Sequence, residues 1–271
     1  MKVNEPLNSL YFTCRVEELA KDYGKVQAVR NISFDLVPGE VFGLLGPNGS
    51  GKSTILHILT GLLDANRGSV EVNGVCIKDK DSRQWIGFAP DDLPLPVSLT
   101  AVEYLNLHHR LRKRDDRKVA IRLAEALGLS GALGRSISSY SHGMKRKLQL
   151  IAAVMHSPDL LILDEPFRGL DPEASSVLRD LLRIFTGAGG SVLIATHDML
   201  RAELDCDRVM ILYNGEQAAL GSPSALREAY GGLASLEDVF LQATKLDEFQ
   251  VRRREQLRAA LSFDQHGEEL R

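Results

Sequence analysis

A glycine-rich segment, Gly46–Thr54 (G-P-N-G-S-G-K-S-T), constrains the fold of this chain of 271 residues more than any other feature. Its spacing matches the phosphate-binding pattern G-x-x-x-x-G-K-[S/T]. Glycine permits the backbone dihedral angles at which successive N–H groups point toward one anion. We therefore predict that a nucleotide is held by Gly46, Pro47, Asn48, Gly49, Ser50, Gly51, Lys52, Ser53 and Thr54.

The residues on either side of this loop provide the structural context that it requires. Val41–Leu45 predicts a short buried strand, and the apolar spacing over 55–62 predicts a helix whose N-terminal dipole faces the phosphates. Lys52 supplies a positive charge to the terminal phosphates, and the hydroxyl group of Ser53 is suited to bind Mg²⁺.

The remaining strand patterns indicate an α/β fold. Continuous apolar runs at 160–163, 191–196 and 209–212, with helical patterns between them, are typical of a mainly parallel sheet covered on both faces. Residues 12–37 alternate apolar and polar positions, with turn signals at Tyr23-Gly24 and at Asn31, which predicts an N-terminal antiparallel β layer.

Three helices are expected between 97 and 157. The first begins at a capping box, Thr100–Glu103, the second ends at Gly128, and the third begins at Met144. We therefore predict a P-loop ATPase core at 1–96 and 158–222, an inserted helical subdomain at 97–157 and a C-terminal helical tail at 223–271. His108 and His109 on the first helix are interpreted as surface residues.

Ionisable residues follow two of the apolar runs. Asp164 and Glu165 end one run, and His197 follows the next, at the edge where open parallel sheets bind their ligands. Asp164 is suited to hold Mg²⁺, and Glu165 to polarise an attacking water molecule. His197 is placed to approach the γ-phosphate.

The order of these motifs resembles that of the nucleotide-binding subunits of ABC transporters, over roughly 12–222. The resemblance implies that Tyr23 stacks on adenine and that Ser141 and Gly143 belong to the family's signature motif. It further implies a composite ATP site, in which Ser141 and Gly143 of one copy cover the γ-phosphate bound by another copy.

The resemblance also assigns chemical roles. Lys52, Glu165 and His197 would be catalytic, and Ser53 and Asp164 would organise Mg²⁺. Asp91 stands where the family usually has glutamine, and we expect it to be a further Mg²⁺ ligand. Arg168 replaces the small residue that commonly precedes the family's Gly-Leu-Asp motif, present here as Gly169–Asp171.

By the same resemblance, the chain is an ATPase that powers transport of an unknown substrate, with export favoured, at the cytoplasmic face of the membrane. The implied partners are an integral membrane permease and a second ATP-binding subunit, expected to be an identical chain. A net charge of −3 provides no overall basic field, so no nucleic-acid partner is expected. The alternatives are a soluble ATPase of this superfamily that acts on nucleic acid, and a small-molecule phosphotransferase.

Overall fold

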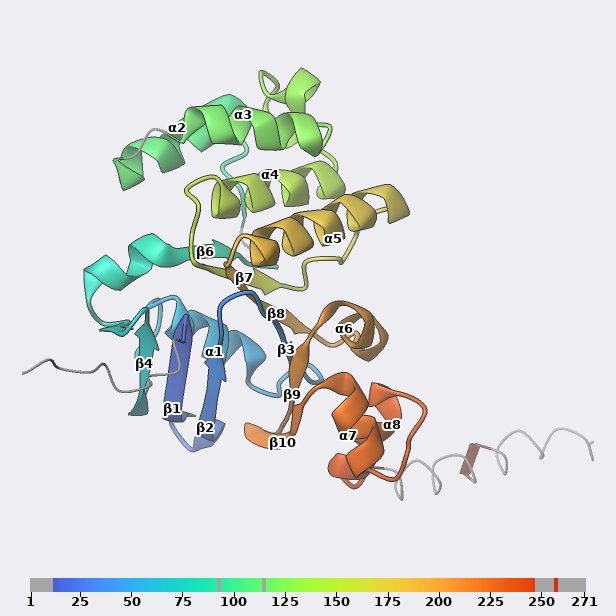
Figure 1. Cartoon of the computed structure of the whole chain (residues 1–271). Helices are drawn as coiled ribbons and strands as arrows, with labels where there is room; N and C mark the ends of the chain where they lie inside the picture. The colour runs from blue at the N-terminus through green and yellow to red at the C-terminus, as the bar shows by residue number, and fades with distance from the viewer. Residues whose placement is uncertain (1–11, 92–93, 114–115, 247–255, 258–271) are drawn as a thin grey trace, which may run out of the picture.

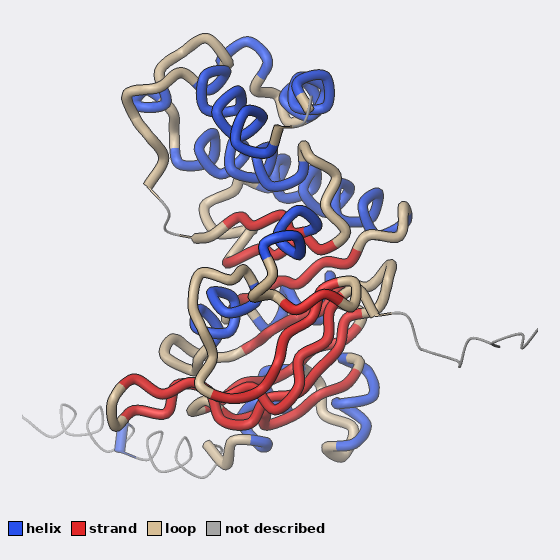
Figure 2. Tube along the Cα trace, turned by 90° about the vertical axis from the view of Figure 1, so that its left-hand side faces the viewer, coloured by secondary structure: helices blue, strands red, loops and turns tan. Residues whose placement is uncertain are grey.

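The computed structural model describes residues 12–91, 94–113, 116–246 and 256–257. Two β-sheets form the lower part of the molecule as drawn in Figure 1, and a layer of helices lies above them. Figure 2 shows the same separation from the side, with the strands gathered below and helices above.

The smaller sheet is antiparallel and has the strand order β2-β1-β4-β5. Its strands are β1 (Cys14–Tyr23), β2 (Val26–Leu36), β4 (Arg67–Val72) and β5 (Val75–Cys76). A turn joins β1 to β2 at Gly24, as predicted. The predicted turn at Asn31 is wrong. Asn31 lies inside β2 with φ 52°, where the pairing with β1 shifts register, so its left-handed backbone forms a bulge instead of a turn.

The larger sheet has the strand order β10-β9-β3-β8-β7-β6. Its strands are β3 (Val41–Leu45), β6 (Ile86–Ala89), β7 (Leu160–Asp164), β8 (Ser191–Thr196), β9 (Arg208–Tyr213) and β10 (Glu216–Gly221). The pairs from β9 through β6 are parallel, and β10 is antiparallel to β9. The predicted α/β fold with a mainly parallel sheet and a separate antiparallel layer is therefore confirmed.

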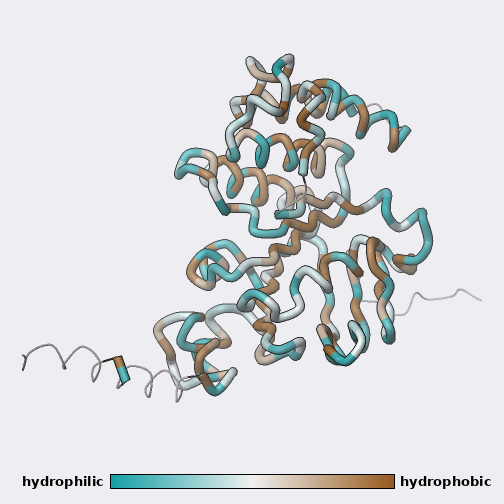
Figure 3. The backbone as a smooth tube through the Cα atoms, turned by 180° about the vertical axis from the view of Figure 1, so that it is seen from behind, coloured by the Kyte–Doolittle hydropathy of each residue, from teal (hydrophilic) through white to brown (hydrophobic). Residues whose placement is uncertain are grey.

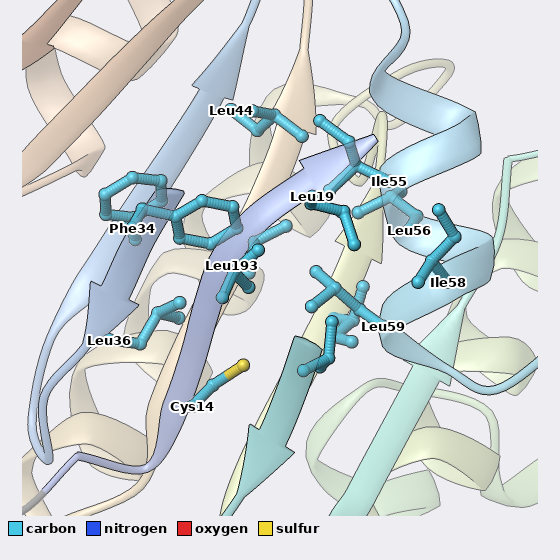
Figure 4. Close-up of a cluster of buried hydrophobic side chains, with 14 of the residues drawn as sticks. Cys14, Leu19, Phe34, Leu36, Leu44, Ile55, Leu56, Ile58, Leu59 and Leu193 are labelled. Atoms are coloured by element: carbon cyan, nitrogen blue, oxygen red, sulfur yellow. The ribbon is translucent and has the colours of Figure 1, made fainter. Parts of the chain in front are cut away.

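Helix α1 (Lys52–Leu59) packs between the two sheets. Figure 4 shows Ile55 and Leu56 of α1 beside Leu19 of β1, with Phe34 of β2 and Leu193 of β8 in the same apolar cluster. Phe34 stacks on Phe42 of β3, with ring centroids 5.2 Å apart. Because the helix begins at the phosphate loop, this packing fixes the position of the loop relative to the parallel sheet.

Four further helices pack on the opposite face of the larger sheet. They are α5 (Pro172–Gly187), α6 (Met199–Asp205), α7 (Pro223–Ala229) and α8 (Leu236–Ala243). The hydropathy colouring in Figure 3 shows the apolar strands running between the more polar outer elements. The part of the predicted C-terminal tail at 247–255 and 258–271 lies outside the described residues.

The upper layer contains α2 (Ala101–Arg112), α3 (Arg117–Ala126) and α4 (His142–Val154), with α2 and α3 farthest from the sheets (Figure 1). The predicted capping box is confirmed: Thr100 N donates to Glu103 Oε2 at 2.8 Å, and Glu103 N donates to Thr100 Oγ1 at 3.3 Å. The chain also forms short 3-10 helices, which are η1 (Lys80–Trp85), η2 (Ser130–Ala132) and η3 (Ile137–Ser139). Helix α4 begins two residues before the predicted start at Met144.

Helix α4 packs in two directions. Leu150 and Ala153 join the core between the larger sheet and helices α5 to α8, whereas Leu148 and Ile151 join the core of the helical layer. Gly87 of β6 allows this close approach, because a Cβ atom there would lie 2.1 Å from the carbonyl oxygen of Ala153. One helix therefore connects the helical layer directly to the strands that carry the site.

The prediction that His108 is a surface residue is wrong. Its ring is half-buried and packs edge-on against Tyr104, with ring centroids 4.6 Å apart. Burial, with a smaller contribution from Arg112, lowers the pKa of His108 to about 4.

Among the described residues, none of the helices is both long enough and apolar enough to cross a bilayer.

Candidate nucleotide site

The predicted phosphate loop opens into a cleft of about 830 Å³ at the carboxyl-end edge of the parallel sheet. The cleft brings together residues from the loop, from α1 and from the ends of β6, β7 and β8. The lining residues are Ala28, Asn48, Gly49, Gly51, Lys52, Ser53, Thr54, His57, Pro90, Asp91, Asp164, Glu165, Arg168 and His197.

The loop itself has the backbone geometry of an anion cradle. Gly51 has φ 110°, and a Cβ atom there would lie 2.4 Å from the carbonyl oxygen of Ala28. At Gly46, a Cβ atom would lie 2.3 Å from the carbonyl oxygen of Leu212. The Ser50 hydroxyl oxygen is buried and has no hydrogen-bond partner within the described part of the chain. Only glycine fits at the two close approaches.

The ammonium group of Lys52 lies over this loop. Its Nζ atom donates to the carbonyl oxygens of Gly46 at 2.6 Å and Pro47 at 3.1 Å. Burial lowers the pKa of Lys52, and the negative charges of Glu165 and Asp164 oppose that shift. A buried cation in a cleft with few other cations is a strong point of attraction for a phosphate group.

Glu165 is held by the end of the neighbouring strand, β8. Its Oε2 atom accepts a hydrogen bond from Thr196 Oγ1 at 2.8 Å, and its Oε1 atom lies 2.6 Å from His197 Nδ1. The backbone N–H of His197 also donates to Oε1, at 2.9 Å. Since an ionised carboxylate only accepts hydrogen bonds, His197 must donate from Nδ1. Glu165 itself has φ 45°, an unfavourable angle for a residue with a side chain, and these contacts hold it there.

Asp164 is next to Glu165 and is partly buried. Burial raises the pKa of Asp164, and the charges of Asp91 and Glu165 raise it further, against the opposing effect of Arg146 and Lys52. The negative charges of Asp91 and Glu165 therefore act on Asp164, although no three His, Cys, Asp or Glu residues in the described part of the chain are grouped so that they could hold a metal ion by themselves.

Asp91 is paired with an arginine. Arg168 Nη1 lies 2.6 Å from Asp91 Oδ2. Both residues are departures from the pattern usual at their positions in the resembling family, and the structure places them in direct contact. The role of Asp91 as a Mg²⁺ ligand stays a prediction.

Arg146 is a residue of the site that was not predicted from the sequence, and it is almost completely buried. From α4, its guanidinium donates to the carbonyl oxygen of Pro90 at 2.6 Å and to that of Asp164. The sequence signal that could have revealed its burial is its spacing from the apolar residues of α4. Arg146 lies one helical turn before Leu150 on the buried face of α4, but it is flanked by Lys145 and Lys147 and reads as part of a solvated basic run.

Six predicted site residues are not among those that line this cleft: Tyr23, Gly46, Pro47, Ser50, Ser141 and Gly143. Tyr23 is about half exposed at the end of β1, and its role in stacking on adenine stays a prediction. Ser141 caps α4 by accepting a hydrogen bond from Met144 N at 3.3 Å, and Gly143 lies in the first turn of the same helix. Next to Ser141, the ring of His142 lies so near Gly169 that a Cβ atom on Gly169 would be 2.5 Å from His142 Cδ2.

The residues present fit a magnesium ion with a polyphosphate. Hydroxyl and carboxylate oxygens are the ligands that Mg²⁺ prefers, and Ser53 and Asp164 offer one of each in the cleft. Gly49 and Gly51, which line the cleft, have φ angles of 81° and 110°, a backbone conformation that suits N–H groups turned toward one anion.

Curated relatives share most of the length of this chain. The linearmycin resistance ATP-binding protein LnrL of Bacillus subtilis (strain 168) is 36% identical over 235 residues, which cover 85% of this chain and 74% of that protein. The ABC-type transporter ATP-binding protein EcsA of the same strain is 36% identical, with 86% and 96% covered. The Nod factor export ATP-binding protein I of Rhizobium meliloti (strain 1021) is 36% identical, with 82% and 68% covered.

The family and structure comparisons agree with these relatives. The model of the ABC transporter family matches residues 29–168. A solved structure described as an ATP-binding subunit of an ABC transporter superposes with a TM-score of 0.81 at 30% identity, covering 86% of this chain and 99% of that one. ATP binding and hydrolysis that powers transport are the activity of this family. The chain therefore belongs to the ATP-binding subunits of ABC transporters.

Proposed function

We propose that this chain binds ATP with Mg²⁺ in the cleft, hydrolyses it, and drives export of a substrate through a separate membrane permease. The observation that carries the proposal is the convergence of Lys52, Ser53, Asp164, Glu165 and His197 on one cleft. Two relatives named for resistance and for export favour the direction of transport.

Each residue has a proposed role in the hydrolytic step. Lys52 leaves the carbonyl oxygens of Gly46 and Pro47 to neutralise phosphate charge, and Ser53 and Asp164 hold Mg²⁺. Magnesium bound there offsets negative charge on the phosphates. Glu165 orients and deprotonates the attacking water, while Thr196 and His197 keep its carboxylate aimed into the cleft.

A second copy of the chain completes the site in this proposal. Ser141 and Gly143 lie at the start of α4 and outside the cleft of their own chain, so their hydroxyl and N–H groups are available to the γ-phosphate bound by a partner. The assembled complex would sit at the cytoplasmic face of the membrane, bound to its permease.

Substitution of the proposed base tests the chemistry. Glu165→Gln keeps the size of the side chain but removes its basicity, so we expect ATP hydrolysis to fall by roughly 10²- to 10⁴-fold while ATP binding is retained. Glu125→Gln, an exposed site on α3, is the control and should hydrolyse at the wild-type rate. Hydrolysis by Glu165→Gln at the wild-type rate would remove Glu165 from the mechanism.

The same variant tests assembly. Because ATP persists in Glu165→Gln, the variant should form a dimer in ATP and remain monomeric in ADP, as measured by light scattering after size-exclusion chromatography. Purification of the tagged chain from detergent-solubilised membranes should recover an integral membrane protein in near-equal amount. Recovery of soluble proteins or nucleic acid alone would contradict the transporter assignment and leave the ATPase intact.

A further inference from the structure

An ion pair lies inside the nucleotide cleft and joins two loops. Asp91 follows β6, and Arg168 follows the neighbouring strand β7. Arg168 Nη1 is 2.6 Å from Asp91 Oδ2, and both residues line the cleft together with Lys52. The Asp91 side chain is only 15% exposed, whereas that of Arg168 is 61% exposed. The carboxylate is therefore largely removed from water; Arg168 is in direct contact with it, and the charge of the buried Arg146 also acts on it.

The charge balance of the cleft depends on this arginine. Among the described lining residues, Lys52 and Arg168 contribute two positive charges, while Asp91, Asp164 and Glu165 contribute three negative charges, so the lining carries −1 when the histidines are not counted. The buried Arg146 behind the lining adds one positive charge that acts on all three carboxylates. A nucleoside triphosphate is itself an anion, and each uncompensated carboxylate weakens its binding. Without the charge of Arg168, the net charge of the lining residues would be −2. Without the charges of both Arg168 and Asp91, it would be −1 again.

We propose that Arg168 sets the nucleotide affinity of the cleft by neutralising Asp91, so that the two side chains act as one charge-compensated unit. The inference rests on the proposed function, because it takes the ligand to be ATP. It also gives Asp91 a role that does not depend on metal binding. In this arrangement each of the two side chains offsets the charge of the other within the cleft.

The test is a double-mutant cycle on nucleotide binding. Dissociation constants for ADP and for a non-hydrolysable ATP analogue are measured in EDTA for the wild type, Asp91→Asn, Arg168→Gln and the double variant. We expect Arg168→Gln to bind the ATP analogue about tenfold more weakly and Asp91→Asn to bind it severalfold more tightly. The double variant should return to within about twofold of the wild type.

Two further features distinguish charge compensation from loss of a structural contact. The effect of Arg168→Gln should be larger for the ATP analogue than for ADP and should shrink as salt is added, because screening reduces charge interactions. Equal losses for both nucleotides at every salt concentration, or no rescue by Asp91→Asn, would overturn the inference. So would a loss of binding by Asp91→Asn that appears only with Mg²⁺, since it would assign Asp91 to the metal.

A matched ion pair elsewhere provides the control. Arg227 Nη1 lies 2.9 Å from Glu203 Oε1, and this carboxylate is also 15% exposed, but neither residue lines the cleft. Glu203→Gln with Arg227→Gln should leave both dissociation constants unchanged. If the wild type binds neither nucleotide, the proposed function itself fails. If it binds both and the cycle shows no coupling, only the role of the pair fails.

Discussion

His108 illustrates how burial of a single ring makes stability depend on pH. Its pKa is lowered to about 4, whereas an unfolded histidine titrates near about 6.5. Between these two values the unfolded chain binds a proton that the folded chain does not. The free energy of unfolding should therefore fall as pH drops from about 6.5 to about 4.

Replacement of the ring tests this contribution. His108→Gln should reduce the loss of unfolding free energy across that pH interval by roughly 1 kcal/mol, less than the full pKa shift would give, because the ring is partly solvated. His57, an exposed residue in the last turn of α1, is the site at which the same substitution is made for comparison. An NMR titration of the His108 ring with a midpoint near 6.5 would contradict the burial argument.

At the residue scale, the sequence predicted groups whose position follows from local order along the chain. Asp164, Glu165 and His197 each lie at a strand end, and Lys52 begins the helix after the phosphate loop, so their convergence was foreseeable from a parallel sheet. The contact between Asp91 and Arg168 was not, because 77 positions separate them and their meeting depends on β6 and β7 being neighbours.

At the scale of elements, a buried arginine adds to the apolar packing that holds α4 to the sheet. Arg146→Met removes the donor to two carbonyl oxygens, those of Pro90 and Asp164, while keeping an apolar stem. We expect the free energy of unfolding to fall by about 2 kcal/mol, since hydrogen bonds from charged donors are stronger than neutral ones and the carbonyl groups lose their partner. Chemical denaturation measures this change.

Two further variants show whether the lost hydrogen bonds of Arg146 cause that change in stability. Lys147→Met, at the next position on α4 and less buried, should change stability by less than about 0.5 kcal/mol. Arg146→Lys keeps the charge but loses the planar fork that reaches both oxygens, and should lie between the wild type and Arg146→Met. Unfolding of Arg146→Met at the wild-type denaturant concentration would show that packing alone holds α4.

Elements with a strong local signal were predicted well, and elements decided by pairing were not. The capping box at Thr100 and the end of α3 at Gly128 follow from residues within one turn of each other. Asn31 was assigned to a turn because asparagine tolerates a left-handed backbone, but the same property serves a bulge. Only the register between β1 and β2 decides between the two.

At the scale of the whole molecule, the chain enters and leaves the helical layer through two differently held segments. The entry, at Pro90 and Asp91, is held by side-chain groups of Arg146 and Arg168. At the exit, Asp159 N donates to Trp85 O at 2.9 Å, and Asp159 O accepts from Ser191 N at 2.8 Å. The exit is thus part of the backbone hydrogen bonding of the sheet.

Hydrogen exchange should report this difference. Binding of a non-hydrolysable ATP analogue should slow amide exchange at 86–91 and in the first turn of α4, since contacts in the cleft reach the entry, and should leave 158–160 unchanged. Arg168→Gln should reduce the protection at 86–91. Equal protection at entry and exit would contradict a difference between the two segments.

The placement of α4 has a mechanical consequence. Helix α4 leads at its C-terminal end toward a junction held by backbone hydrogen bonds at Asp159, and near its N-terminal end Arg146 ties it to Pro90 and Asp164. Helices α2 and α3 pack on α4 in the same layer (Figure 1), so a displacement of α4 would be passed on to them. A change of charge in the cleft that altered the contacts of Arg146 would in this way reach the outer surface of the helical layer.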